Sequence, residues 1–100
     1  MCQRELRRMF NRADDEFLAY DNIKPERRFH TRPDINAFIL LDKLVPGTRD
    51  MVCASEHDEI WLDVDFELLA KSAVTEEDVR DLVRCGVRYD EHSDSLAMFT

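Results

Sequence analysis

The sequence predicts an α+β fold in which about four helices pack on a small antiparallel sheet built from two β-hairpins. Apolar residues recur at three- and four-residue spacing in several segments, which is typical of helices. Two other segments, 51–65 and 87–99, alternate apolar and polar residues as strands do. Helices grouped around antiparallel hairpins form α+β folds. With 100 residues, 44% of them hydrophobic, the chain is expected to form a single domain, residues 1–100, with a modest core.

The first segment is helical but carries its charges in an unfavourable order. Its apolar residues share one helical face: Leu6, Phe10, Ala13, Phe17 and Tyr20. Arginines come first and acids last, against the helix macrodipole. We therefore expect a break at Asn11, which would cap a second helix that begins with the acids. Residues 1–11 would then be either a separate basic helix or an arm.

The polar stretch 21–32 contains Pro25 and is predicted to be a loop. Pro33 can be the first residue of the next helix. The sequence INAFILLDKLV that follows is apolar on most sides, which is typical of a helix in the centre of a core. Pro46 and Gly47 should end this helix.

A first hairpin is predicted from strands 51–55 and 59–65, joined by the acidic turn of residues 56–59. The even spacing pairs three residues of each strand on the core face: Ser55 with Ile60, Cys53 with Leu62, and Met51 with Val64. The opposite face would carry Val52, Ala54, Glu56, Glu59, Trp61 and Asp63. The only tryptophan of the chain is thus expected among acids.

Two helices and a second hairpin are expected in the last third of the chain. Asp65 can cap a short helix over 66–72. Thr75 is the predicted N-cap of the next helix, and Gly86 follows its last turn. Val74 and Val79 would pack together at its start, and its core face would be Val79, Leu82 and Val83. In the second hairpin, Val87 and Tyr89 would pair with Met98 and Leu96.

Charge divides the chain into a slightly basic beginning and a strongly acidic remainder. The formal net charge is −8. Residues 1–33 hold eight basic and six acidic side chains, whereas residues 34–100 hold six basic and sixteen acidic ones. An acidic body repels nucleic acid and membranes and attracts basic partners. Because no apolar run reaches the length of a membrane span and no signal peptide is present, we expect a soluble, cytoplasmic protein.

Three stretches, RPDINAFILLDKLVPG, VCASEHDEIWLDVD and EEDVRDLVRCGVRYDEHSDSLAMF, together resemble small acidic accessory proteins of phages and prophages. The resemblance covers roughly residues 32–99. It implies an accessory protein of a bacterial host cell that disarms host machinery. It brings no catalytic residue with it.

Zinc and catalysis are the two kinds of chemical site to consider. Cys53 precedes His57 by four residues and Cys85 precedes His92 by seven, at corresponding ends of the two hairpins. A zinc-binding module is therefore one hypothesis, although such Cys residues are more often core and such His residues solvated turns. Asp63 and Asp65 could act as an acid–base pair only if one were desolvated. We expect neither an enzyme nor a cofactor.

The amino-terminal arginines are a further candidate site. Four of them, Arg4, Arg7, Arg8 and Arg12, fall within nine residues. They could contact phosphates, and a small nucleic-acid-associated regulator is the alternative function. The acidic composition of the whole chain makes direct nucleic-acid binding the weaker hypothesis. Pairing of these arginines with acids of the same chain or of a second copy is the simpler interpretation, and a homodimer is left open.

The hypothesis we favour is a non-enzymatic protein–protein interaction module with an acidic face. Tryptophan is enriched at interaction hot spots, and acids around it would steer a basic partner. The partner would be a host protein with a basic surface, which the acids would occupy as a nucleic-acid mimic. Whether Trp61 is exposed or covered by a helix is left open. The predicted partner-binding residues are Trp61, Glu56, Asp58, Glu59, Asp63, Asp65, Glu67, Glu76, Glu77, Asp78 and Asp81.

Overall fold

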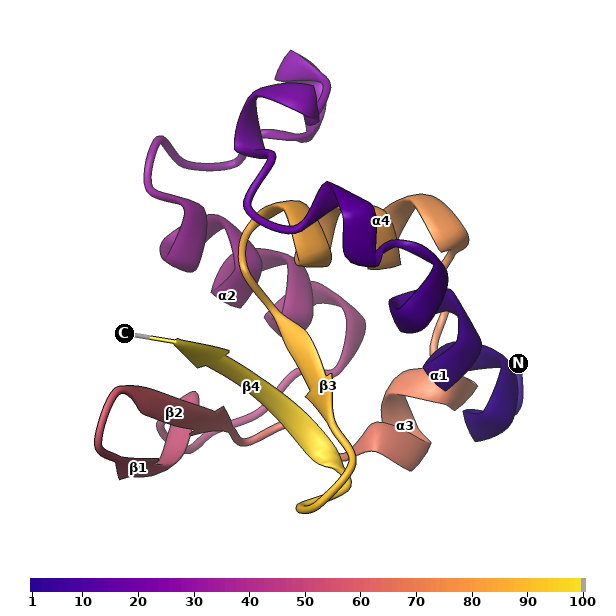
Figure 1. Ribbon diagram of the computed structural model, residues 1–100, viewed down its shortest axis with the longest axis vertical. Helices are drawn as coiled ribbons and strands as arrows, with labels where there is room; N and C mark the ends of the chain where they lie inside the picture. Colours follow the sequence, from indigo (N-terminus) through magenta and orange to yellow (C-terminus); the bar gives the residue numbers. More distant parts are fainter. Residues whose placement is uncertain (100) are drawn as a thin grey trace.

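The computed structural model describes residues 1–99 and has the predicted α+β fold (Figure 1). The helices are α1 (Gln3–Arg12), α2 (Pro33–Leu44), α3 (Phe66–Lys71) and α4 (Glu76–Arg84). Three short 3-10 turns lie between α1 and α2: Asp14–Glu16, Tyr20–Asn22 and Pro25–Arg27. The strands are β1 (Val52–Glu56), β2 (Glu59–Leu62), β3 (Arg88–Asp90) and β4 (Ser95–Phe99).

The four strands form one antiparallel sheet in the order β1-β2-β4-β3. Each predicted hairpin is present, and the two hairpins join because β2 pairs with β4, with Trp61 opposite Ala97. β1 and β3 are therefore the two edges of the sheet. Alternation along the strands gives the sheet an inner face, which carries Leu62, Leu96 and Met98, and an outer face, which carries Trp61.

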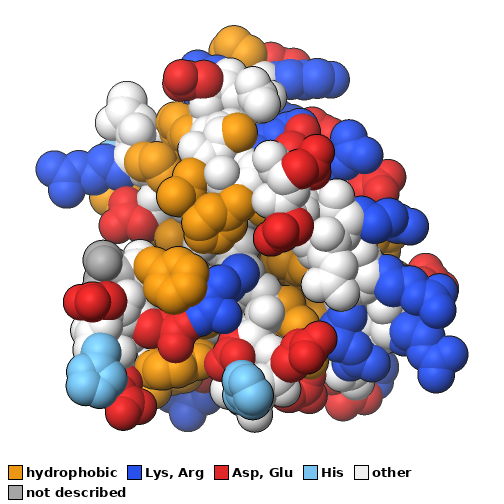
Figure 2. Space-filling view, in the orientation of Figure 1, with side chains coloured by type: hydrophobic (Ala, Val, Ile, Leu, Met, Phe, Trp, Pro, Cys, Tyr) orange, Lys and Arg blue, Asp and Glu red, His pale blue; other side chains and the backbone are white. Residues whose placement is uncertain are grey.

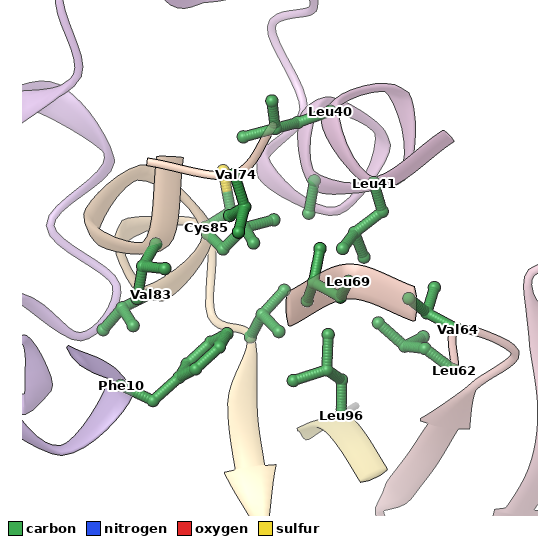
Figure 3. Close-up of a cluster of buried hydrophobic side chains, with 14 of the residues drawn as sticks. Phe10, Leu40, Leu41, Leu62, Val64, Leu69, Val74, Val83, Cys85 and Leu96 are labelled. Carbon is green, nitrogen blue, oxygen red and sulfur yellow. The ribbon is translucent and has the colours of Figure 1, made fainter. Parts of the chain in front are cut away.

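The inner face of the sheet and all four helices contribute to one core (Figure 3). Phe10 of α1, Leu41 of α2 and Leu69 of α3 are buried together with Val83 of α4 and Leu96 of β4. In Figure 3 these side chains converge from different elements on a common centre. Because all four helices pack on this core, they lie against the inner face of the sheet. The helices do not cover the outer face.

The amino-terminal segment differs from its prediction. The expected break is present but lies two residues later than Asn11: α1 continues to Arg12 and gives way at Ala13 to a 3-10 turn, so Asn11 caps no helix. The predicted second helix does not form: Leu18 adopts φ +64, a conformation through which no helix continues. Leu6 and Phe10 are buried in the common core. Residues 3–12 are thus a packed helix and not a detached arm.

The first hairpin is shorter and more irregular than predicted. Ser55 pairs with Ile60 as expected, but Leu62 pairs with Val52 and not with Cys53, because a β-bulge interrupts β1 between Val52 and Ala54. β2 also ends at Leu62, three residues early. Every residue of β1 is exposed, so the expected core face of Cys53 and Ser55 is wrong: core packing does not reach this edge of the sheet.

The last third follows its prediction closely. Asp65 caps α3, accepting hydrogen bonds from the backbone N–H groups of Glu67 and Leu68. Thr75 caps α4 and forms a reciprocal capping box with Asp78. Gly86, at φ +97, ends that helix. Tyr89 pairs with Leu96 as predicted, whereas Val87 is buried just before β3, which begins at Arg88.

The helices are also short in relation to a lipid bilayer. Among the residues that the structure describes, none of the helices has both the length and the apolar character required to cross a membrane.

Candidate functional site

The outer face of the sheet carries a hollow of about 430 Å³, which we call the sheet-face pocket. It lies between the two hairpins, and both of its ends are turns. Its lining residues are Glu56, His57, Asp58, Glu59, Trp61, Asp90, His92 and Phe99. In Figure 2 histidines lie along the lower edge of the molecule, over the hairpins, among acidic and hydrophobic side chains. Of the predicted acids, three gather with Trp61 here.

Trp61 is half-buried, and the structure decides the alternative that the sequence left open. Its ring lies on the outer face, away from the helices, with Ala97 directly beside it in the sheet. Its indole Nε1–H donates to Asp90 Oδ2 at 3.0 Å. The polar edge of the ring is therefore satisfied within the chain, and the rest of the ring is a wall of the pocket.

Asp90 is a site residue that the sequence did not identify. Its carboxylate accepts the Trp61 indole, the Ser93 hydroxyl (2.7 Å) and the backbone N–H of His92 (3.3 Å). The hydrogen bond from Trp61, and then that from Ser93, lowers the pKa of Asp90 below its ordinary value. Asp90 thus holds Trp61 to the β3–β4 turn. The Asp-x-x-Ser spacing was the available signal, but the tryptophan lies 29 residues away in sequence.

Two glutamates face each other across the first hairpin. Glu56 of β1 is directly opposite Glu59 of β2. Like charges in such a position destabilise a sheet. Arg88 of β3 neutralises one of them: it forms an ion pair with Glu59, and its guanidinium lies 4.5 Å from the centre of the Phe99 ring. Among residues 1–99, the one ion-pair partner of Glu56 is the exposed His57, with 3.8 Å between Oε1 and Nε2.

The next three predicted acids have local partners. Asp63 forms an ion pair with Arg49 (3.1 Å), and Glu67 forms one with Lys71 (3.0 Å). Asp65 uses its carboxylate to cap α3. These residues border a separate hollow of about 510 Å³, at the end of β2 and the start of α3. They do not line the sheet-face pocket.

The four predicted acids of α4 form a third group, and each of them contacts an arginine. Asp78 and Asp81 are only 8% and 1% exposed. Arg27 pairs with both, and Arg84 pairs with Asp81 (2.9 Å). The prediction that Asp78 and Asp81 belong to an exposed acidic face is therefore wrong. Proximity in sequence suggested a face, but α4 turns these two carboxylates towards arginines from the 25–27 turn and from its own last turn.

The two outer acids of α4 also have partners. Glu76 contacts Arg12 (3.3 Å), and Glu77 contacts Arg84 (3.5 Å). Figure 1 shows α4 in the upper half of the view and the β1–β2 hairpin at the lower left. The eleven residues predicted as one surface are thus divided among three places.

The amino-terminal arginines are divided as well. Arg4 and Arg8 are exposed on α1, Arg7 is half-buried, and Arg12 is paired with Glu76. Basic side chains gather at the right-hand margin of Figure 2, over α1. Acids lie among them, so the basic character of this surface is local.

The residues considered for zinc or catalysis lie apart. Cys53 Sγ donates to the Trp61 carbonyl, whereas Cys85 is buried and accepts from Asn36 Nδ2 at 3.6 Å. Burial raises the pKa of the Cys85 thiol to about 11, which disfavours the nucleophilic thiolate. Within residues 1–99, His, Cys, Asp and Glu side chains form no group of three or more that could hold a metal ion.

Comparison with known proteins gives no relative: no protein-family model, no curated protein and no solved structure matches the chain.

Proposed function

We propose that this protein is a non-enzymatic protein-binding module that uses the sheet-face pocket to bind a basic segment of a partner protein. The observation that carries the proposal is the half-buried Trp61 in a pocket whose lining also includes four carboxylates, those of Glu56, Asp58, Glu59 and Asp90. An aromatic ring beside acids suits a cationic side chain, which gains both cation–π attraction and charge pairing.

The Glu56–Glu59 pair supports the same proposal. Two opposed carboxylates cost stability, and Arg88 offsets part of this cost at Glu59. A cation placed beside Glu56 would relieve the repulsion that remains. Proteins keep such locally unfavourable arrangements mostly at functional sites. Arg88 already forms an ion pair with Glu59, so Glu56 is the carboxylate to which a cation from a partner would bind.

Following the resemblance to phage and prophage accessory proteins, we further propose that the partner is a host protein whose basic surface becomes blocked. A compact site around Trp61 fits this role better than an extended imitation of a nucleic-acid backbone, because the acids of α4 are paired within the chain. The partner would contact few residues, with Trp61 at the centre and Glu56 and Asp58 at the rim.

The test compares affinity purification of partners by wild-type and Trp61→Ala protein. A partner retained by the wild type should bind the variant at least about 2 kcal/mol more weakly, the usual scale of a hot spot. Trp61→Phe is the matched control: it keeps an aromatic wall and loses only the hydrogen bond to Asp90. A folded Trp61→Ala variant that retains every partner at wild-type affinity would overturn the proposal.

The same comparison of variants distinguishes our proposal from the alternative, nucleic-acid binding through α1. It depends on the exposed Arg4 and Arg8. If Arg4→Gln/Arg8→Gln abolished a salt-sensitive association with nucleic acid that Trp61→Ala left unchanged, the alternative would replace our proposal.

A further inference from the structure

The two edges of the sheet differ in how far they are covered. β3, at one edge, packs against α1. β1, at the other, is exposed along all five of its residues. It contains no proline, lysine or arginine, the residues that commonly protect an edge from pairing with another strand. Its main chain therefore offers unpaired hydrogen-bonding groups to an incoming strand.

Ser55 presents those groups at a defined place. Glu56 and Glu59 flank a two-residue turn, so they form the pair whose main chains bond to each other. Main-chain direction alternates along an antiparallel strand, and the N–H and C=O of Ser55 therefore point to the free edge. The bulge at Cys53 interrupts this pattern. The accessible edge is consequently short, from Ala54 to Glu56.

On the outer face, one row of side chains runs across all four strands. Ala54 is opposite Trp61, Trp61 is opposite Ala97, and Ala97 is opposite Arg88. Trp61 thus stands between two alanines. Beyond one alanine is Arg88, whose side chain crosses β4 to reach Glu59 on β2. Beyond the other alanine is the free edge.

The path of the Arg88 side chain shows how a cationic side chain on a strand added at the free edge could lie. A long cationic side chain on a strand beside β1, opposite Ala54, would cross the small Ala54 just as Arg88 crosses β4. It would reach Trp61 from the opposite side and meet Glu56, the glutamate that has no arginine. Ala54 leaves the path open because its side chain is a single methyl group.

We propose that the partner binds by strand addition: an extended segment pairs with β1 at Ala54–Glu56 and places an arginine or lysine opposite Ala54. This inference rests on the proposed function and specifies its partner as an extended basic peptide segment. A basic segment fits this edge better than the β1 strand of a second copy of the chain. That β1 carries a glutamate and no basic residue, so it would bring a second negative charge to Glu56. Main-chain bonds to Ser55 would supply affinity, and the cation would supply specificity.

The experiment uses a peptide of about seven residues, the length of an ordinary strand, that alternates threonine and valine around a central arginine. Binding to ¹⁵N-labelled protein is followed by NMR. We expect shifts of both the Ser55 amide and the Trp61 indole N–H. Glutamine in place of the arginine should weaken binding about tenfold or more, because a charge-assisted contact is lost. N-methylation of alternate peptide residues, on the side that faces β1, should abolish binding.

Two variants of Ser55 provide the matched pair. Ser55→Pro removes the outward N–H at an edge position where proline is tolerated, and it should abolish binding. Ser55→Ala keeps that N–H and should bind as the wild type does. An unchanged Trp61 indole signal in the free variants shows that the sheet is intact. If Ser55→Pro unfolds the protein, the N-methylated peptide tests the same bond from the other side.

The outcomes separate this inference from the proposed function. A peptide that shifts Trp61 equally in wild-type and Ser55→Pro protein would overturn strand addition and leave a cation-binding pocket. Protection of Ser55 that grows with protein concentration, without peptide, would make a second copy the occupant and also overturn the inference. An arginine peptide that shifts neither signal would also overturn strand addition. The proposed function would still be tested separately, by the affinity purification with Trp61→Ala.

Discussion

The acids of α4 and the acids of the sheet-face pocket look alike in the sequence but do different things in the structure. Asp78 and Asp81 are buried, and two arginines hold them in place. Glu56 is exposed and lies opposite another glutamate. Asp78 and Asp81 stabilise the fold, whereas Glu56 is open to solvent and costs stability through its position opposite Glu59. A carboxylate is therefore a candidate for recognition only when its own chain leaves it without a cation.

The largest expected effect comes from breaking the buried group. Asp81→Asn removes the charge that faces Arg27 and Arg84, and it leaves Arg84 buried with less compensation. We predict a loss of about 3 kcal/mol in the free energy of unfolding, the scale for removing one partner of a buried ion pair. Chemical denaturation would measure it. A loss below about 1 kcal/mol would mean that the α4 acids are no more structural than those of the pocket.

Thr75→Ala tests the same region through its helix cap. Thr75 Oγ1 accepts from the Asp78 N–H at 3.1 Å, and the Asp78 carboxylate accepts from the Thr75 N–H at 3.0 Å. Loss of the first bond should cost about 1 kcal/mol of stability. Thr75→Ser, which keeps the hydroxyl, is the control. Equal stability of the alanine and serine variants would show that the cap contributes nothing to α4.

Glu56→Gln sharpens the comparison because its expected effect has the opposite sign. Like Asp81→Asn, it removes one negative charge, so the change in net charge is matched. Relief of the repulsion with Glu59 should raise the free energy of unfolding slightly, by about 0.3 kcal/mol. The same denaturation experiment measures both variants. A clear destabilisation by Glu56→Gln would contradict the view that Glu56, whose one contact of this kind within residues 1–99 is with the exposed His57, adds no stability to the fold.

The smallest effect concerns pH and the anchor of Trp61. The pKa of Asp90 is lowered in the folded protein, so its stabilising contribution is present above the pKa of an unfolded aspartate. That contribution is lost as pH falls through the lower folded value. The Trp61 indole N–H signal should move over this same acidic range in an NMR titration. In Asp90→Asn it should not move there, and a shift that persists would assign the titration to another carboxyl group.

Local signals were sufficient for much of the fold. The caps at Asp65 and Thr75 and the pairing of Tyr89 with Leu96 follow from a few adjacent residues. Features set by distant contacts were not predictable in this way. The bulge at Cys53 and the left-handed Leu18 depend on packing that no short motif encodes.

The sequence predicted the central residues of the candidate site but not which of the other acids belong to it. Alternation along β2 correctly placed Trp61 beside Glu59 on one face. The division of the other acids could not be foreseen, because Arg27 lies more than 50 residues before the aspartates that it binds. Asp90 was missed for the same reason. Composition reports how many acids a chain has, and only the fold decides which of them are neutralised.

The most direct test of this account compares Glu56→Lys with Glu76→Lys for binding of the arginine peptide. Both variants change the net charge equally and both replace an exposed acid, but Glu76 belongs to α4 and already contacts Arg12. We predict that Glu56→Lys weakens binding about tenfold or more and that Glu76→Lys leaves it nearly unchanged. Equal weakening by the two variants would contradict the account, because it would mean that overall charge attracts the peptide and that the sheet-face pocket has no special part in binding.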